Sequence, residues 1–218
     1  MSRTCFINCG IGPWYSSGTD RLRESLEKHK FQGDVITWKD WPEIPFRRDS
    51  IYNCKAAAFQ QVIDAGYTTI IWADSSIFAQ DDVAPFVEHV TKEGLWIGQS
   101  GYNGAQTCTD ACLRYFGISR NHAERMRDAA TGLFGVNIEK PFAKEFIETW
   151  IRAARDGAFA GSRLHDGQSN DPRFLFGRQD QSVATIILGK NLIKLSFFSE
   201  YVAYKWDSYS SIFRCEGM

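Results

Sequence analysis

The sequence has almost no net charge, because its 25 lysine and arginine residues nearly balance its 26 aspartate and glutamate residues. Proteins that bind nucleic acid or an anionic membrane through their overall field carry a clear excess of positive charge. The balance therefore argues against nucleic acid as a partner. Hydrophobic residues make up 44% and charged residues 23% of the chain, as in ordinary globular proteins.

Long hydrophobic runs are also missing. No stretch approaches the ~20 apolar residues of a membrane-spanning helix. The first ten residues, MSRTCFINCG, lack the apolar segment of a secretory signal peptide. We therefore expect a soluble cytoplasmic protein without a membrane span. With 218 residues, the chain is expected to form a single domain over residues 1–218.

The six cysteines include no C-x-x-C pair. Cys108 and Cys112 lie four positions apart, which on a helix places them on one face, but no neighbouring histidine completes a metal site. A chain of this length does not need disulfide bonds for its stability. We expect buried free thiols in a reducing compartment rather than half of a metal site.

Several nucleotide-binding and hydrolytic motifs are absent. Gly10 and Gly12 are followed by proline and tryptophan, so this segment does not match the dinucleotide-binding pattern G-x-G-x-x-G. The G-K-[ST] ending of a P-loop does not occur, and neither does G-x-S-x-G or H-E-x-x-H. Phosphate transfer from ATP by a P-loop is therefore not expected.

Aromatic residues are the one abundant class, at 14% of the chain with seven tryptophans. Most aromatic rings fill cores, although exposed rings also stack on sugars and bases.

Apolar strand-like segments alternate with helical ones. Strands are expected at 4–8, 33–38, 68–73, 95–98, 132–138 and 191–197, and helices at 21–30, 52–66, 81–94, 110–117, 120–129, 141–157 and 179–190. Residues 9–20 are expected to form a loop, with Asp20 capping the next helix. The tail beyond residue 197 is expected to be irregular. This alternation predicts an α/β fold with a mostly parallel sheet, whose ligands bind beyond the carboxyl ends of the strands.

One buried strand ends on a carboxylate, in the segment IIWADSS. Asp74 either makes an ordinary turn or helix cap, or faces the ligand crevice. With Ser75 and Ser76 beside it, its carboxylate belongs to the oxygen ligands that hard divalent cations prefer. The sequence therefore makes Asp74 a candidate ligand of an ion that neutralises a diphosphate.

A second polar group opens the last helix, in the segment GRQDQSV. Asp180 there is either a residue that complements the helix dipole, or a base or hydroxyl ligand at the mouth of a site together with Gln181. The polar segment LHDGQSND, which contains His165, is either a surface loop or a lid over the site.

Three segments occur in the order that is typical of glycosyltransferases with the GT-A fold. IIWADSS resembles their strand that ends in D-x-D, TGLFGVN resembles a later strand that ends in asparagine, and GRQDQSV resembles their late D-Q motif. More narrowly, the chain resembles the glycosyltransferase domain with which large chlorella viruses modify their capsid glycoprotein. The resemblance covers nearly the whole length, and the order of the motifs is more specific than any one of them.

The resemblance implies a Rossmann-like GT-A fold with flanking helices and a small second sheet. It implies transfer of a hexose from a nucleoside diphosphate, most often a UDP-sugar such as UDP-glucose or UDP-rhamnose, to a hydroxyl group of a glycan or glycoprotein. For a viral protein the location would be the host cytoplasm. Carried over to this sequence, the donor-binding residues are Cys9, Gly10, Ile11, Gly12, Trp38, Asp40, Lys55, Ala73, Asp74, Ser75, Thr131 and Gly132.

The resemblance also implies a cofactor and a catalytic group. Asp74 and Ser76 would hold Mn²⁺ or Mg²⁺, with His165 as a further candidate ligand. Ser76 stands where the family carries its second aspartate, so binding would also depend on the diphosphate, on water or on another residue. The implied catalytic residues are Asp180, Arg178 and Gln181, with Asp180 as the base or as a contact to sugar hydroxyls.

Two other functions stay open. A sugar-nucleotide pyrophosphorylase would carry a loop like G-x-G-T-R-L-x-P, which SGTDRLRES only partly matches. A non-catalytic carbohydrate-binding module would keep the fold without the chemistry, and the single aspartate of ADSS is compatible with it.

Overall fold

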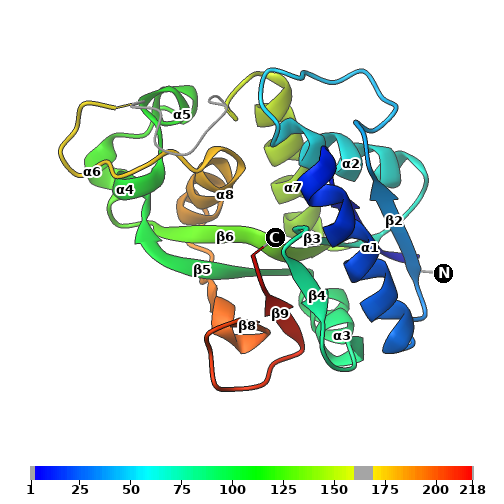
Figure 1. Ribbon diagram of the computed structural model, residues 1–218. Helices are drawn as coiled ribbons and strands as arrows, with labels where there is room; N and C mark the ends of the chain where they lie inside the picture. The colour runs from blue at the N-terminus through cyan, green and yellow to red at the C-terminus, as the bar shows by residue number, and fades with distance from the viewer. Residues whose placement is uncertain (1–2, 160–168, 218) are drawn as a thin grey trace.

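The computed structural model describes residues 3–159 and 169–217, and a six-stranded sheet lies at its centre (Figure 1). In the order β2-β1-β3-β6-β5-β7, its strands are Asp34–Trp38, Thr4–Cys9, Thr69–Ala73, Arg127–Asn137, Leu95–Asn103 and Ser196–Phe197. β1 pairs in parallel with β2 and β3, β7 pairs in parallel with β5, and β6 is antiparallel to both β3 and β5. Only β6 therefore runs against the others, which confirms an α/β fold with a mostly parallel sheet.

A second, three-stranded sheet confirms the other part of the expected architecture. It has the order β4-β9-β8, formed by Ile77–Ala79, Phe213–Cys215 and Val202–Tyr204. The expectation of an irregular tail was wrong, because the tail contributes β8 and β9. Val202 and Phe213 are fully buried, and this burial anchors the tail.

Helices cover both faces of the central sheet (Figure 1). α2 (Asn53–Asp64), α7 (Pro141–Arg155) and α8 (Gln179–Lys190) pack on one face, and α1 (Pro13–Lys28), α3 (Ala84–Glu93) and the small sheet pack on the other. Alternation along the strands produces these two cores. In β1, Ile7 joins the first core and Phe6 the second. The short helices α4 (Gly104–Thr107), α5 (Asp110–Phe116) and α6 (Arg120–Ala123) precede β6, and the 3₁₀ helix η1 (Phe198–Glu200) follows β7.

The expected loop at residues 9–20 is largely helical. α1 begins at Pro13, after Gly12 with φ 93°, a backbone conformation that glycine tolerates and other residues rarely adopt. Asp20 therefore lies inside α1 and is not its cap. Its carboxylate instead pairs with the ammonium group of Lys39 at 2.8 Å.

Three further elements have bounds that differ from the expectation. β6 begins at Arg127, so Thr131 and Gly132 lie within the strand, and the helix expected at 120–129 ends at Ala123. The last strand has two residues instead of seven, because Leu192 adopts φ 54° in a turn.

All six cysteines are free thiols, as expected, and four of them are buried. No helix in the described ranges is long and apolar enough to cross a membrane.

Candidate active site

A buried lysine joins two carboxylates at the carboxyl ends of the parallel strands. Lys55, in the first turn of α2, places its Nζ 2.9 Å from Oδ1 of Asp74 and 3.0 Å from Oδ2 of Asp180. The carbonyl oxygen of Thr131 accepts a third hydrogen bond at 3.3 Å. Lys55 and Asp180 are buried, whereas the side chain of Asp74 is 38% exposed. Four segments that are distant in the sequence therefore meet at one ammonium group.

Asp74 directly follows β3 and is held firmly. Its Oδ1 also accepts a hydrogen bond from Nε1 of Trp72 at 2.7 Å, and its backbone N–H donates to the carbonyl of Gly132 at 2.7 Å. Gly132 leaves space at Oδ2, since a Cβ at that position would lie 3.4 Å from this oxygen. Asp74 is thus fixed through Oδ1, and Oδ2 is left for a ligand.

Asp180 lies in the first turn of α8, where the helix dipole favours negative charge. The Thr131 hydroxyl donates to its Oδ2 at 2.7 Å, and Trp150 Nε1 donates to its backbone carbonyl at 3.0 Å. Among the described residues, the side-chain hydrogen bonds and ion pairs of Asp180 all use Oδ2. Lys55 therefore engages one oxygen of each carboxylate, and among the described residues no hydrogen bond or ion pair occupies the other oxygen.

Burial and charge oppose each other in this cluster. Burial acts to lower the pKa of Lys55, but the charges of Asp180 and Asp74 outweigh it and raise that pKa above its ordinary value. Burial raises the pKa of Asp180, and Lys55 and Thr131 offset this only in part. Lys55 therefore stays charged, and Asp180 takes up a proton more readily than an exposed aspartate, as a general base requires.

A cavity of about 300 Å³ lies beside the cluster and opens beyond β1 and β3. Five of the predicted donor-binding residues line it: Cys9, Ile11, Lys55, Asp74 and Ser75. Ser76, a predicted metal ligand, lines it too. Trp72, expected from the sequence as a wall of the pocket beside Asp74, lines it as well. Four other lining residues were not predicted: Tyr15, Ile51, Tyr52 and Cys54. Three of these lie within four positions of Lys55 in the sequence, and this proximity is the signal that would have identified them.

The remaining predicted donor residues lie outside the lining of this cavity. They are Gly10, Gly12, Trp38, Asp40, Ala73, Thr131 and Gly132. Gly10 packs against the backbone of Tyr15, where a Cβ would come within 2.5 Å of the Tyr15 carbonyl oxygen. Asp40 accepts a hydrogen bond from the backbone N–H of Trp41 at 2.7 Å. Thr131 acts within the cluster, through Asp180 and Lys55.

Arg178 and Gln181 flank Asp180 and point to different partners. The Arg178 guanidinium lies over the Phe176 ring, 4.7 Å from its centroid, and its buried Nε has no hydrogen-bond partner among the described residues. Gln181 instead donates from Nε2 to Oδ2 of Asp128 at 3.0 Å. Arg178 therefore has one unsatisfied N–H donor, whereas Gln181 serves a buried carboxylate.

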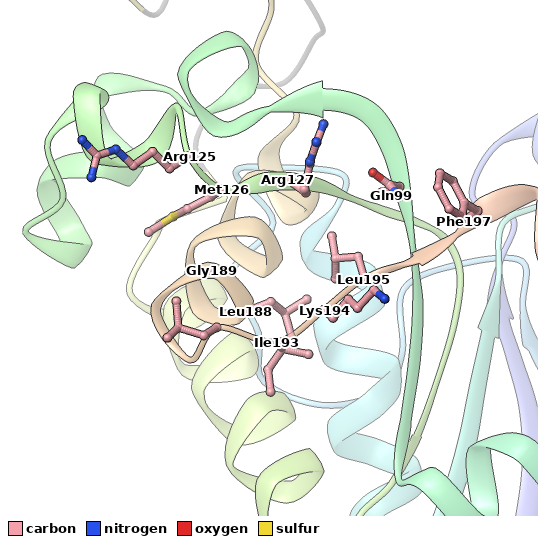
Figure 2. A pocket seen from close by; sticks show the side chains of 11 residues that line it. Gln99, Arg125, Met126, Arg127, Leu188, Gly189, Ile193, Lys194, Leu195 and Phe197 are labelled. Carbon is pink, nitrogen blue, oxygen red and sulfur yellow. The ribbon is translucent and has the colours of Figure 1, made fainter.

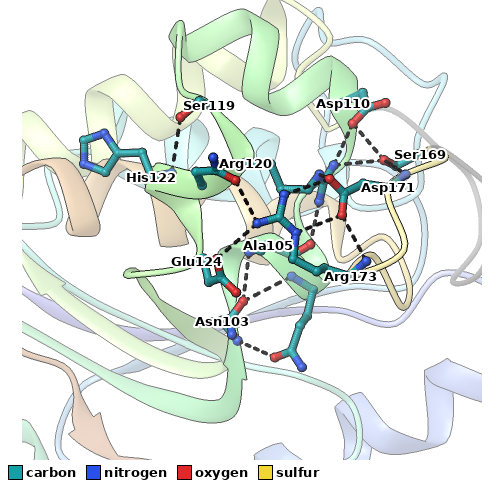
Figure 3. A network of polar contacts seen from close by, with 12 residues as sticks. Asn103, Ala105, Asp110, Ser119, Arg120, His122, Glu124, Ser169, Asp171 and Arg173 are labelled. Atoms are coloured by element: carbon teal, nitrogen blue, oxygen red, sulfur yellow. Dashed lines mark hydrogen bonds and ion pairs between the residues drawn. The ribbon is translucent and has the colours of Figure 1, made fainter.

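A polar network fixes the segment that leads into α8 (Figure 3). Arg120 pairs with Asp110 at 2.6 Å and lies 3.8 Å from Asp171. Arg173 pairs with Asp171 at 2.8 Å and with Glu124 at 3.1 Å. These contacts tie residues 169–173 to the short helices α5 and α6, and so help to position the start of α8.

The cluster does not fit a resident divalent ion. Within residues 3–159 and 169–217, no three histidine, cysteine, aspartate or glutamate side chains form a group that could hold one. The Lys55 ammonium lies between the two carboxylates, and Ser76 Oγ contacts Cys215 Sγ at 3.6 Å. His165 lies outside the described residues. Asp74 Oδ2 is the one predicted carboxylate ligand atom that these contacts leave open.

A second cavity of about 460 Å³ lies at the other end of α8 (Figure 2). Its apolar lining includes Leu188, Leu195 and Phe197, and Arg125 and Arg127 also line it. No carboxylate of the described residues lines this cavity, so they do not reproduce the acid-base chemistry of the Lys55 cluster there.

No family model and no curated protein matches the sequence. Among solved structures, the chain is similar to a glycosyltransferase involved in the glycosylation of the major capsid of PBCV-1, with a TM-score of 0.45 and 9% sequence identity. The similarity covers 72% of this chain and 69% of the other.

Proposed function

We propose that this protein is a glycosyltransferase that moves a hexose from a UDP-sugar, such as UDP-glucose or UDP-rhamnose, to a hydroxyl group of a glycan or glycoprotein. The observation that carries the proposal is the Asp74–Lys55–Asp180 cluster beside a cavity at the carboxyl ends of parallel strands. The three sequence motifs that resemble those of GT-A enzymes converge there. Asp74 comes from the first, Thr131 from the second and Asp180 from the third.

The cavity suits a nucleotide donor. Its volume of about 300 Å³ is at the lower end of small-molecule pockets. Tyr15 and Tyr52 offer aromatic faces to a base, and the open Oδ2 of Asp74 accepts a hydrogen bond from a ribose or sugar hydroxyl.

In the proposed reaction, the acceptor oxygen attacks the anomeric carbon, and the bond from this carbon to the diphosphate oxygen breaks. The hydroxyl proton passes to Oδ1 of Asp180, and UDP leaves with the bonding electron pair. Lys55 holds both carboxylates in place, and the Arg178 guanidinium supplies positive charge near the departing diphosphate. In the presence of Mn²⁺ or Mg²⁺, Asp74 would be the residue that holds the ion together with the diphosphate, and the ion would supply further positive charge to the leaving group.

Asp74→Ala is expected to weaken the binding of UDP-glucose in the presence of Mn²⁺ by about 10- to 100-fold, because a charged hydrogen-bond acceptor is lost. Calorimetric titration measures this. Asp64→Ala, which removes an exposed carboxylate at the far end of α2, is the matched control and should bind as the wild type does. Equal affinity of the Asp74→Ala variant and the control would exclude Asp74 from the donor site.

An assay for slow hydrolysis of the donor distinguishes the proposed transferase from a non-catalytic carbohydrate-binding module. A transferase without an acceptor transfers its sugar to water at a low rate, whereas a module without the chemistry leaves UDP-glucose intact.

A further inference from the structure

Two aromatic rings form an exposed stacked pair at the end of β8. The rings of Tyr204 and Trp206 have centroids 5.0 Å apart and planes that differ by 2°. Trp206 is 71% exposed, although tryptophan is normally among the more buried residues. One face of the indole is covered by Tyr204, and the high exposure leaves much of the ring accessible to a ligand.

The turn that carries this pair is held in one conformation. The backbone N–H of Tyr204 donates to the Asp207 carboxylate at 2.7 Å, and the N–H of Asp207 donates back to the Tyr204 carbonyl at 2.9 Å. Arg214 donates to the Lys205 carbonyl at 2.6 Å. A ligand that stacks on the pair therefore meets a surface that is already ordered, which reduces the entropic cost of binding.

Two separate contacts connect the pair to the candidate active site. The Phe198 ring lies 6.0 Å from the Tyr204 ring, centroid to centroid, and a Cβ on Gly132 would lie 3.9 Å from Phe198 and 3.4 Å from Asp74 Oδ2. On the other side, Tyr204 is the strand partner of Cys215, whose thiol contacts Ser76. The aromatic pair is thus continuous with the surroundings of the open Asp74 oxygen.

The stacked pair presents an aromatic surface to solvent. Such a surface suits the apolar C–H face of a sugar ring, whose hydroxyls stay in contact with water or with polar groups at its edge.

We propose that Tyr204 and Trp206 form the surface on which a sugar ring of the acceptor stacks. The proposal rests on the proposed function and assigns the acceptor class: a glycan, bound through a sugar ring next to the hydroxyl that is glycosylated. Stacked there, the acceptor lies beside Gly132 and Asp74 Oδ2.

Trp206→Ala tests the assignment. The probes are the methyl α- and β-glycosides of glucose, galactose and mannose, observed by saturation-transfer NMR. We expect at least one glycoside to receive saturation from the wild-type protein, and Trp206→Ala to weaken its binding by about tenfold or more. Trp206→Phe keeps an aromatic face and should retain part of the binding. The exposure of Trp206 predicts that both variants fold, which circular dichroism checks.

Phe197→Ala is the matched control, because Phe197 is also 71% exposed but lines the second cavity. It should bind the glycosides as the wild type does. Equal binding by Trp206→Ala, or no saturation of any glycoside by the wild type, overturns the assignment. Hydrolysis of UDP-glucose by the wild type tests the proposed function separately. Glycoside binding at Trp206 without hydrolysis would retain the sugar site and reject the transferase.

Discussion

Asp180→Asn is expected to lower the rate of sugar transfer by about 10²- to 10⁴-fold, the usual contribution of a general base. The amide keeps the shape of the side chain and its hydrogen bond with Thr131, but it cannot accept the proton of the acceptor hydroxyl. Binding of the UDP-sugar should be retained, because Asp180 does not line the donor cavity. Initial rates with an acceptor and calorimetric titration with the donor measure the two effects separately.

Asp128→Asn provides the matched control for this substitution. Asp128 is also a fully buried aspartate close to α8, but its carboxylate binds Ser100, Thr107, Thr185 and Gln181 rather than Lys55. Its asparagine variant should transfer sugar within a few-fold of the wild-type rate when both proteins are folded. Wild-type turnover by Asp180→Asn would exclude the proposed base.

Lys55→Met is expected to reduce the free energy of unfolding by about 3–5 kcal/mol, because the removal of one partner from a buried ion pair leaves an uncompensated charge. Asp180 would then be a buried carboxylate beside Asp74 without a counter-ion. Urea unfolding of the variant and the wild type at equal pH measures the loss. An effect below about 1 kcal/mol would show that the cluster is not a stabilising unit.

The destabilisation by Lys55→Met should also depend on pH. Burial already raises the pKa of Asp180, and loss of the Lys55 charge raises it further. A carboxyl group with a raised folded-state pKa favours the fold at pH values below its unfolded-state pKa, and this contribution is lost as the pH rises through the folded-state pKa. The variant should therefore lose more stability near neutral pH than at about pH 5.

A double variant separates charge from packing. In Lys55→Met/Asp180→Asn the unpaired buried charge is gone, so part of the lost stability should return. If the double variant is as unstable as Lys55→Met, the loss comes from the packing of the lysine side chain and not from its charge.

The main helices and strands could be predicted because their hydrophobic patterns extend over many residues. α8 has the predicted bounds, residues 179–190, and β3 was found from its apolar run. β8 and β9 were missed because each has only three residues, too few to show the alternation of apolar and polar side chains that identifies a strand. The start of α1 was missed because glycine and serine in its first turns read as loop, although Pro13 marks a helix start.

The candidate site was predicted in its parts but not in its arrangement. Asp74, Lys55 and Asp180 were each singled out, yet the sequence paired Asp74 with a metal and not with Lys55. An ion pair between distant segments depends on how the helices pack on the sheet, and local sequence does not encode this. The aromatic pair at Tyr204 and Trp206 was missed for a different reason. The sequence alone does not show which aromatic side chains are exposed and which lie in the core.

Calorimetric titration with UDP-glucose, with GDP-mannose as the control and with and without Mn²⁺, measures whether the site binds a UDP-sugar. We expect UDP-glucose to bind and GDP-mannose not to bind. Mn²⁺ should strengthen binding only when the nucleotide is present, because the described residues do not form a resident metal site. Absence of binding by both nucleotide sugars in the presence of Mn²⁺ would contradict the transferase and favour the carbohydrate-binding module.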